Sequence, residues 1–427
     1  MYAALTLTIG LAFAPPPGSG RGAEPHLGEP AKEIALGFEQ ALARARELAP
    51  ERALRRSAKE LEGSSVGVGP FVKNPTLELS PNLRFSPSSD LGPEGQLIVR
   101  FPLDVAGLGA ARERVIDRVG AELEAQADEL GLEGTLSAAR AWLDLWVVVE
   151  TQGSAERDAA LARELVGKLS AARRVEEASA LDVLDAEVLA DEAELAILAL
   201  EGERHDRALR LARVLAMAPS PLPTVAGGLP EPALPAPVEQ ASWPAELPAV
   251  RRAERAAELA EARAEEARAA SATDLSLGWS LTRDAPQGWT TGAVIAIGLP
   301  WFDRAQASTA EHESAARVQA ATSALERERG RADLAAELHE VEHTRELSQR
   351  LEAVIVPRHE AVASARQRLV EAGEATVHEL VLARRALVAA RRRAIEAKAA
   401  HALARVRAKL VYEAGAARAA SSRGAGR

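Results

Sequence analysis

The chain has 427 residues and a formal net charge of −10, with 52 Lys and Arg against 62 Asp and Glu. This acidic balance, without a long basic run, gives no reason to expect a nucleic-acid partner. Cysteine is absent, which excludes disulfides and thiolate metal sites. Aromatic residues make up only 3%, while Ala, Glu, Leu and Arg dominate, a composition that favours long helices over a compact mixed core.

The first residues predict a cleaved secretory signal over residues 1–23. The apolar run YAALTLTIGLAFA ends in Ala12-Phe13-Ala14 and precedes a Pro/Gly-rich stretch, which is the pattern of a signal core and its cleavage region. The alternative is a disordered N-terminal segment. No later run approaches the roughly 20 apolar residues of a membrane-spanning helix, so any membrane contact is expected to use strands.

Residues 24–64 predict a charged amphipathic helical segment, broken at Pro50. Strict alternation then takes over in NPTLELSPNLRF (74–85) and QLIVRFPL (96–103), with a turn-rich stretch between them. This pattern predicts a first transmembrane β-hairpin within residues 65–103. The apolar side of the hairpin consists of Leu77, Leu79, Leu83, Phe85, Leu97, Val99, Phe101 and Leu103.

The rest of the chain repeats this plan. A long helical hairpin is expected over 104–216, with its tip near 174–182, followed by a Pro-rich linker or equatorial segment over 217–248 and a short helix over 249–272. A second transmembrane hairpin is then expected over 273–302. A second long helical hairpin is expected over 303–416, with its tip near 372–379, and a disordered tail over 417–427. The apolar side of the second β-hairpin consists of Leu275, Leu277, Trp279, Leu281, Ala293, Ile295, Ile297, Leu299 and Trp301.

The fold class is therefore mainly α with a small β part, built as a duplicated β-hairpin plus long helical hairpin. About 70 residues of helix reach on the order of 100 Å, too far and too polar to fold back over the sheet. Apolar-out alternation is typical of transmembrane strands, and four strands cannot close a barrel, so several copies are expected to complete one. Tryptophans near the strand ends fit an interfacial aromatic belt, namely Trp279, Trp289 and Trp301.

Around these features the chain resembles the TolC family of outer-membrane efflux channels. The resemblance covers residues 33–416 and rests on the duplicated plan together with NPTLELSPN, ASALDVLDAE, IAIGLPWFDRAQASTAEHESA and LVEAGEATVHELVLARRALVAARR. The compact length and the LPWFDR junction look closest to the metal-cation efflux branch. The resemblance implies a homotrimer whose twelve-stranded outer-membrane barrel continues as a periplasmic α-helical barrel, a periplasmic adaptor and an inner-membrane transporter as partners, and no cofactor or enzymatic activity.

The resemblance also implies functional residues at the periplasmic tips. Matching the family's tip pattern selects Asp182 and Asp185 in the first half, and Gly373 and Glu379 in the second. This chain departs from that pattern at two positions, where Glu176 replaces the first glycine and Leu382 the last acid. Three copies would place rings of acids near a constriction, where like charges attract cations. The alternatives are ordinary solvated acids near helix N-termini and a glycine that simply permits the turn.

One motif points elsewhere. His339-Glu340-Val341-Glu342-His343 matches the zinc-protease pattern H-E-x-x-H, for which Glu360 could serve as a third ligand. The surrounding rod-like helix offers no strand edge for a peptide, so we interpret the match as accidental. Two alternatives to a channel therefore remain, a periplasmic coiled-coil adaptor or scaffold and a zinc metalloprotease. An adaptor would have one helical hairpin, whereas this chain predicts two.

Overall fold

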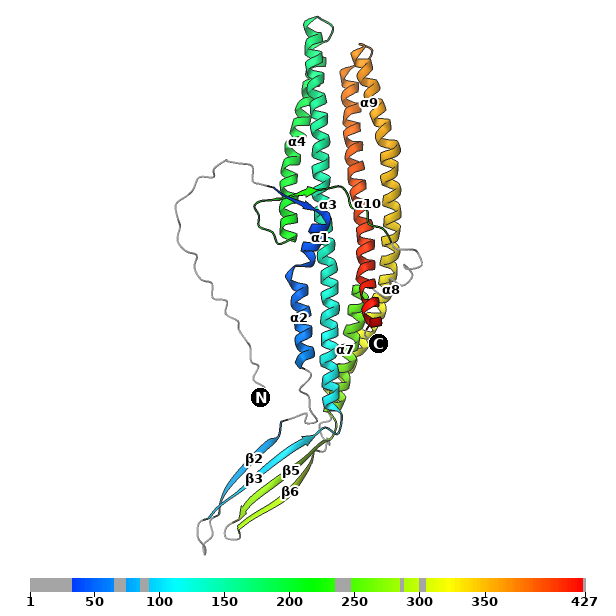
Figure 1. The fold of residues 1–427 in the computed structure, drawn as a ribbon. Helices are drawn as coiled ribbons and strands as arrows, with labels where there is room; N and C mark the ends of the chain where they lie inside the picture. Colours follow the sequence, from blue (N-terminus) through cyan, green and yellow to red (C-terminus); the bar gives the residue numbers. More distant parts are fainter. Residues whose placement is uncertain are drawn as a thin grey trace, which may run out of the picture.

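The structure, a computed structural model, describes residues 33–64, 74–84, 92–234, 247–284, 288–298 and 305–424. The expected signal segment, 1–23, lies outside these ranges. The described part of the molecule is elongated, with a small sheet at one end and long helices filling the rest (Figure 1). The expectation of a mainly helical chain with a small β part is thus confirmed.

The elements of the first half are β1 (Ile34–Gly37), α1 (Phe38–Arg46), α2 (Ala49–Ser64), β2 (Thr76–Arg84), β3 (Gly92–Leu103), α3 (Leu108–Arg174), α4 (Ala180–Val214) and β4 (Pro223–Ala226). The elements of the second half are α7 (Pro248–Ala270), β5 (Asp274–Asp284), β6 (Gly288–Gly298), α8 (Gln306–Arg350), the π-helical turn η2 (Leu351–Ile355), α9 (Val356–Glu371) and α10 (Val377–Gly424). Among the described helices, none combines the length and apolar character that crossing a bilayer demands.

The N-terminal segment differs from its prediction. Residues expected to start a helix form β1, which pairs in parallel with β4 of the Pro-rich stretch, and the Ile34 amide donates to the Leu222 carbonyl at 3.0 Å. A partner almost 190 residues away decides this conformation, so the local pattern could not reveal it. The helix break precedes Pro50, which lies in the first turn of α2, where a missing N–H costs nothing.

The end of the chain also differs from its prediction. Helix α10 continues to Gly424, although residues 417–427 were expected to be disordered. The sequence there, AARAASS, is rich in alanine, whose high helix propensity lets the last helix continue past the predicted end.

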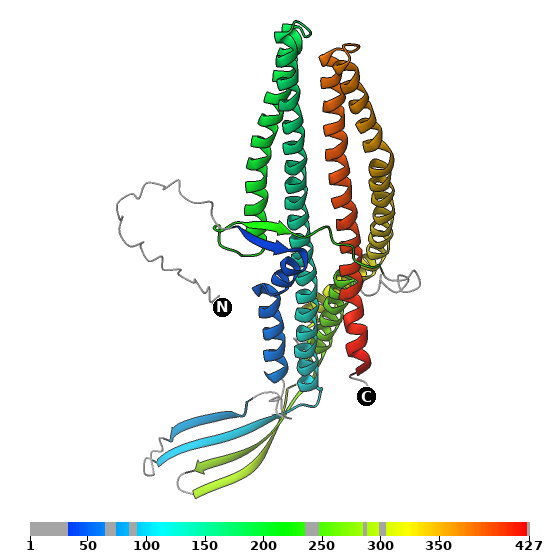
Figure 2. The ribbon, with the colours of Figure 1, turned by 45° about the horizontal axis from the view of Figure 1, so that its top comes forward.

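The helices form two hairpins, α3 with α4 and α8–η2–α9 with α10. Helix α3 has 67 residues, which corresponds to about 100 Å of continuous helix. Both views show α4, α3, α10 and α9 side by side in that order toward the tips (Figures 1 and 2). Helices α4 and α9 therefore form the two outer flanks of this layer.

The main core lies where the helical hairpins meet β1 and α1. Trp142 of α3 is fully buried there, and its indole N–H donates to the Leu36 carbonyl at 2.8 Å. The Phe38 ring packs edge-on against it, with the ring centroids 5.3 Å apart. Alanines occupy much of the remaining α3 contact surface, which lets the neighbouring helix backbones approach closely.

A four-stranded antiparallel sheet forms the other end of the molecule, in the order β2-β3-β5-β6. The central pairing, β3 with β5, joins the two halves of the chain. The backbones of β3 and β5 approach each other closely at Gly278, where a Cβ atom would lie 2.4 Å from the Val99 carbonyl oxygen. Only glycine fits that position without moving the β3 backbone.

Candidate membrane surface and helical tips

One face of the sheet is apolar along all four strands. The register aligns Leu77 with Val99, Val99 with Trp279 and Trp279 with Ala293, and the next row aligns Phe101, Leu277 and Ile295. Odd-numbered side chains therefore share one face, as the alternation predicts. Their exposure is high for large apolar groups, with 69% for Leu77, 46% for Leu277 and 67% for Ile295.

The opposite face of the sheet carries mainly polar or small side chains, with the buried Ile98 of β3 as an exception. Arg100 and Glu78 form an ion pair of 2.9 Å there, and the Ser280 hydroxyl donates to the Gly292 carbonyl at 3.2 Å. Within the described residues, neither β2 nor β6 pairs with a further strand on its outer side. The protomer thus presents an exposed apolar face and two unpaired strand edges, a combination that water does not favour.

Of the three tryptophans expected near strand ends, Trp289 lies at the start of β6, whereas Trp279 lies in the middle of β5, so the expectation is wrong for Trp279. Trp279 and Trp289 are 47% and 65% exposed, and the Arg283 guanidinium lies over the Trp289 ring at 5.6 Å from its centroid. Trp301 lies outside the described residues. An amphipathic ring beside a cation near a strand end is the arrangement that a membrane–water boundary favours.

The first helical tip is the turn after α3. Helix α3 ends at Arg174, and Glu176 follows with φ of 65°, in the left-handed region that favours glycine. The Glu176 amide donates to the Arg173 carbonyl at 3.1 Å, and the Glu177 amide donates to the Ala172 carbonyl at 3.0 Å. These two bonds form a Schellman motif that ends the helix.

The same tip restarts as α4 with a capping box. The Ser179 hydroxyl accepts a hydrogen bond from the Asp182 amide at 3.1 Å, and the Asp182 carboxylate accepts from the Ser179 amide at 3.0 Å. Asp182 therefore stabilises the helix start. Asp185 lies one turn further along and has no hydrogen-bond or ion-pair partner among the described residues.

The second helical tip repeats this construction. Gly373 has φ of 72°, its amide donates to the Val370 carbonyl at 3.0 Å, and the Glu374 amide donates to the Leu369 carbonyl at 2.8 Å. The Glu379 amide then donates to the Thr376 hydroxyl at 3.3 Å as α10 begins.

The Glu379 carboxylate is held within its own hairpin, because it pairs with Arg366 of α9. The four candidate residues thus fall on two structurally equivalent tips, at one constant offset in the numbering. The equivalent pairs are Glu176 with Gly373, Ser179 with Thr376, Asp182 with Glu379, and Asp185 with Leu382.

An apolar cluster joins the two hairpins close to the tips. Leu165 of α3 and Ala186 of α4 pack with three buried residues of α10, which are Val377, Leu380 and Val381. The structure therefore brings the two tip regions together through this cluster. No described contact joins Asp182 or Asp185 to Glu379.

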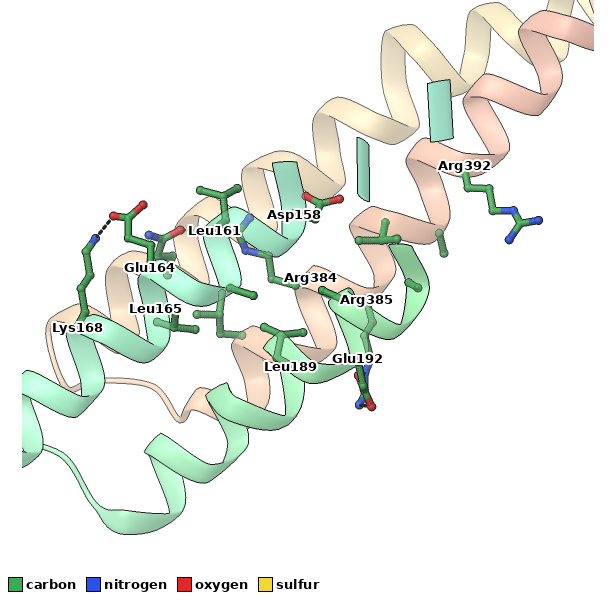
Figure 3. Close-up of a pocket in the computed structure, with 17 residues that line it drawn as sticks. Asp158, Leu161, Glu164, Leu165, Lys168, Leu189, Glu192, Arg384, Arg385 and Arg392 are labelled. Atoms are coloured by element: carbon green, nitrogen blue, oxygen red, sulfur yellow. Dashed lines mark hydrogen bonds and ion pairs between the residues drawn. The ribbon is translucent and has the colours of Figure 1, made fainter. Parts of the chain in front are cut away.

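A pocket of about 290 Å³ lies next to this cluster, between the hairpins (Figure 3). Leucines form part of its wall, and charged residues surround it, including Lys168, Glu192, Arg384, Arg385 and Arg392. Arg385 of α10 bridges to Glu192 of α4, with Nε 3.1 Å from the carboxylate. The sequence alone does not reveal these residues, because partners almost 200 positions apart leave no local signal.

A second ion-pair network joins the hairpins beside that pocket. Arg391 of α10 pairs with Asp158 of α3 at 3.0 Å and with Glu360 of α9 at 2.9 Å. Burial raises the pKa of Asp158 above its ordinary value, and nearby arginines, Arg391 foremost, only partly offset that effect. One oxygen of the Asp158 carboxylate is buried without a hydrogen-bond partner, which is consistent with the raised pKa.

The H-E-x-x-H segment lies on a solvent-facing part of α8. His339, Glu340 and His343 are exposed, and the two histidine rings stack with their centroids 6.1 Å apart. The nominated third ligand, Glu360, is engaged by Arg391. Within the described part of the chain, no cluster of three or more His, Asp or Glu residues could hold a metal ion.

No protein-family model matches the sequence, and no curated protein matches it at a significant level. Solved structures do match. A membrane protein of Pseudomonas aeruginosa aligns with TM-score 0.73 and 14% identity, over 93% of this chain and 96% of that one. The outer membrane protein VceC of Vibrio cholerae aligns with TM-score 0.65 and 16% identity, over 88% of this chain and 96% of VceC. The open state of the MtrE outer membrane channel of Neisseria gonorrhoeae aligns with TM-score 0.62 and 16% identity, over 93% of this chain and 97% of MtrE.

The chain has the TolC fold. The resemblance found in the sequence is thereby confirmed at the level of the fold. Coverage above 95% of the three matched structures means that the TolC fold extends through both the sheet and the long helices of this chain. The metal-cation branch stays a prediction, as do the roles of the tip residues.

Proposed function

We propose that the chain is the channel component of an efflux or secretion system, located in the outer membrane and extending into the periplasm. The observation that carries this proposal is the continuous apolar face of the sheet, exposed in the protomer and bordered by two unpaired strand edges. Lipid favours such a face, but it leaves no water to satisfy an open edge, so the edges require further strands. The TolC fold, shared with MtrE and VceC, supports the same conclusion.

We propose a homotrimer, in which three sheets of four strands make one twelve-stranded barrel. An even number of antiparallel strands per copy keeps the ladder antiparallel where β6 of one copy meets β2 of the next. The polar and small face then lines the lumen. The long helical hairpins of the three copies would form the periplasmic helical barrel and carry the duct about 100 Å further.

The duct is passive in this proposal. The sequence has no phosphate-binding loop and no dinucleotide-binding signature, so the energy for transport would come from an inner-membrane transporter through a periplasmic adaptor. The helical tips are the surfaces furthest from the sheet, which makes them the natural place for those partners to engage (Figure 1).

At the tips we propose a cation-attracting constriction. Asp182 and Asp185 from three copies would form rings of negative charge, with Glu379 contributing more weakly because Arg366 pairs with it. Gly373 would supply the left-handed turn that positions Glu379. The unpartnered state of Asp185 in the protomer favours a role of this kind over a structural one.

Single-channel recording in planar bilayers tests the proposal. The purified protein is expected to give stable conductance steps that divalent cations block. Asp182→Asn with Asp185→Asn should weaken that block severalfold, because the substitution removes the ring charge. Asparagine is preferred to alanine because its side-chain oxygen still accepts the Ser179 hydrogen bonds that begin α4.

Glu201→Gln is the matched control, since Glu201 is an exposed acid on the same helix, remote from the tip. The control should keep the parent's conductance and block. Absence of any conductance from the parent protein would overturn the channel, and unchanged block in the double variant would overturn the constriction.

A further inference from the structure

The apolar face of the sheet carries a single positive charge. The register pairs odd-numbered residues with odd-numbered ones on every strand, so the odd-numbered side chains of β2, β3, β5 and β6 share one face. Among the described side chains of that face, one is charged, and it is Arg283. The described even-numbered side chains of the same strands carry five charges, at Glu78, Glu94, Arg100, Asp274 and Asp284. A lone cation thus interrupts an otherwise uncharged surface.

Arg283 lies beside Trp289 on that face. The two residues are register partners on β5 and β6, and Cζ of the guanidinium lies 5.6 Å from the centroid of the Trp289 ring. Both side chains are exposed. Within the described residues, neither the guanidinium nor the indole N–H makes a hydrogen bond or an ion pair. An arginine has five N–H donors and a tryptophan one, so the pair presents a group of donors that no described side chain uses.

The pair lies at the end of the sheet furthest from the helices. Strand β5 leads away from α7 and ends at Asp284, so its last residues belong to that end (Figures 1 and 2). Arg283 follows Leu275 by eight residues, which is about 27 Å along the strand and about 20 Å along the axis of a barrel whose strands tilt by about 40°. The apolar band of an outer-membrane barrel is about 25 Å tall. With Leu275 at the periplasmic side of the band, Arg283 reaches the headgroups of the outer leaflet.

A phosphate is the group that complements this pair. A guanidinium binds two phosphate oxygens at once through its planar fork, and the indole N–H can donate to a third. A phosphate monoester carries more negative charge than a diester and has three acceptor oxygens, so it uses these donors more fully. Below Arg283 on the same face lie Leu281 and Trp279, which offer apolar surface to acyl chains. Charge and apolar surface therefore match the two ends of a phosphorylated lipid.

We propose that Arg283 and Trp289 bind the phosphate monoester of a lipid in the outer leaflet of the outer membrane, with its acyl chains along Leu281 and Trp279. Each copy contributes one such site, on the outer surface of its second hairpin. The inference deepens the proposed channel and rests on it, because it requires the apolar face of the sheet to lie in the membrane. A bound headgroup would hold this end of the sheet at a fixed depth.

Lipid binding by the purified protein in detergent tests the site. The probe is diphosphoryl lipid A, a glycolipid with phosphate monoesters, and bound lipid is counted by native mass spectrometry. Phosphatidylglycerol, a diester, should bind more weakly, and inorganic phosphate, which has no acyl chains, should not displace the lipid. Arg283→Gln should weaken lipid A binding about tenfold or more, because it removes the charge-assisted hydrogen bonds. Arg283→Lys should bind between these two, since lysine keeps the charge but lacks the fork. Trp289→Leu should also weaken binding.

An exchange of neighbouring residues is the matched control. Thr282→Arg with Arg283→Thr keeps the composition and net charge but moves the cation to the opposite face of β5, so it should bind lipid A as weakly as Arg283→Gln. Parental binding by either variant, equal affinity for phosphatidylglycerol, or displacement by inorganic phosphate would overturn the site. A parent protein that conducts but shows no preference for lipid A would overturn the lipid site alone, whereas a parent protein without conductance would overturn the proposed function.

Discussion

The two tips use the same backbone conformation with different residues. Glu176 and Gly373 both adopt positive φ two residues after a helix end, where a Cβ lies close to the following carbonyl. Nothing lies within 4 Å of a Cβ built on Gly373, so the local backbone alone decides what is tolerated there. The sequence identified these positions as equivalent, but it did not show that Glu176 keeps the glycine conformation.

We expect Glu176→Gly to stabilise the first tip by about 0.5–1 kcal/mol, because it removes a left-handed non-glycine residue. Gly373→Ala should destabilise the second tip by a similar amount. Thermal unfolding in detergent, followed by circular dichroism, should show Tm rising for the first variant and falling for the second. A fall in Tm for Glu176→Gly would mean that the Glu176 side chain contributes more than its conformation costs.

At the scale of elements, the sequence predicted what neighbouring residues determine. Alternation located the strands, and apolar periodicity located the long helices, because each pattern reflects the geometry of its own backbone. The sequence alone could not predict β1 or the Arg391 network, because both depend on partners that only the assembled fold brings together. Asp182 was predicted as a tip residue, but its capping bond with Ser179 was not identified.

The ion pairs between hairpins predict opposite responses to pH. Burial raises the pKa of Asp158, so the folded state binds its proton more tightly than the unfolded chain does, and its contribution to stability falls as pH rises through that raised pKa. Hydrogen bonds from Gln367 and Lys168 lower the pKa of Glu371, so its contribution is present above the unfolded pKa and is lost as pH falls.

We therefore expect Asp158→Asn to raise Tm at pH 7, with an advantage over the parent that shrinks on acidification as Asp158 takes up its proton. Glu371→Gln should lower Tm slightly at pH 7, and its deficit should also shrink in acid. Melting curves at a series of pH values from 3 to 8 would check both signs. A lower Tm for Asp158→Asn at pH 7 would show that the Arg391 pairing outweighs the cost of burying the carboxylate.

At the scale of the whole molecule, the two faces of the sheet have different environments in the proposed barrel. Leu277 and Ser276 are neighbours on β5 that point to opposite faces, and neither belongs to the helical tips. Leu277→Arg should cost about 2–4 kcal/mol if its side chain faces the middle of the bilayer, whereas Ser276→Arg would point into the aqueous lumen.

Recovery of detergent-extracted trimer from the membrane fraction should fall sharply for Leu277→Arg and remain near the parent level for Ser276→Arg. Equal recovery of the two variants would contradict a lipid-facing role for the odd-numbered side chains. Loss of both proteins would point instead to a sheet that is covered by protein on each side.

The equivalence of the two tips has a consequence for symmetry. Three chains with two similar units each would approximate a six-membered ring, but the match between the units is broken where Leu382 stands opposite Asp185. Half of the pseudo-sixfold positions would then carry a carboxylate and the alternate half an apolar methyl surface. At that level the charges would alternate around the opening with apolar sectors, giving it a triangular rather than a round electrostatic outline.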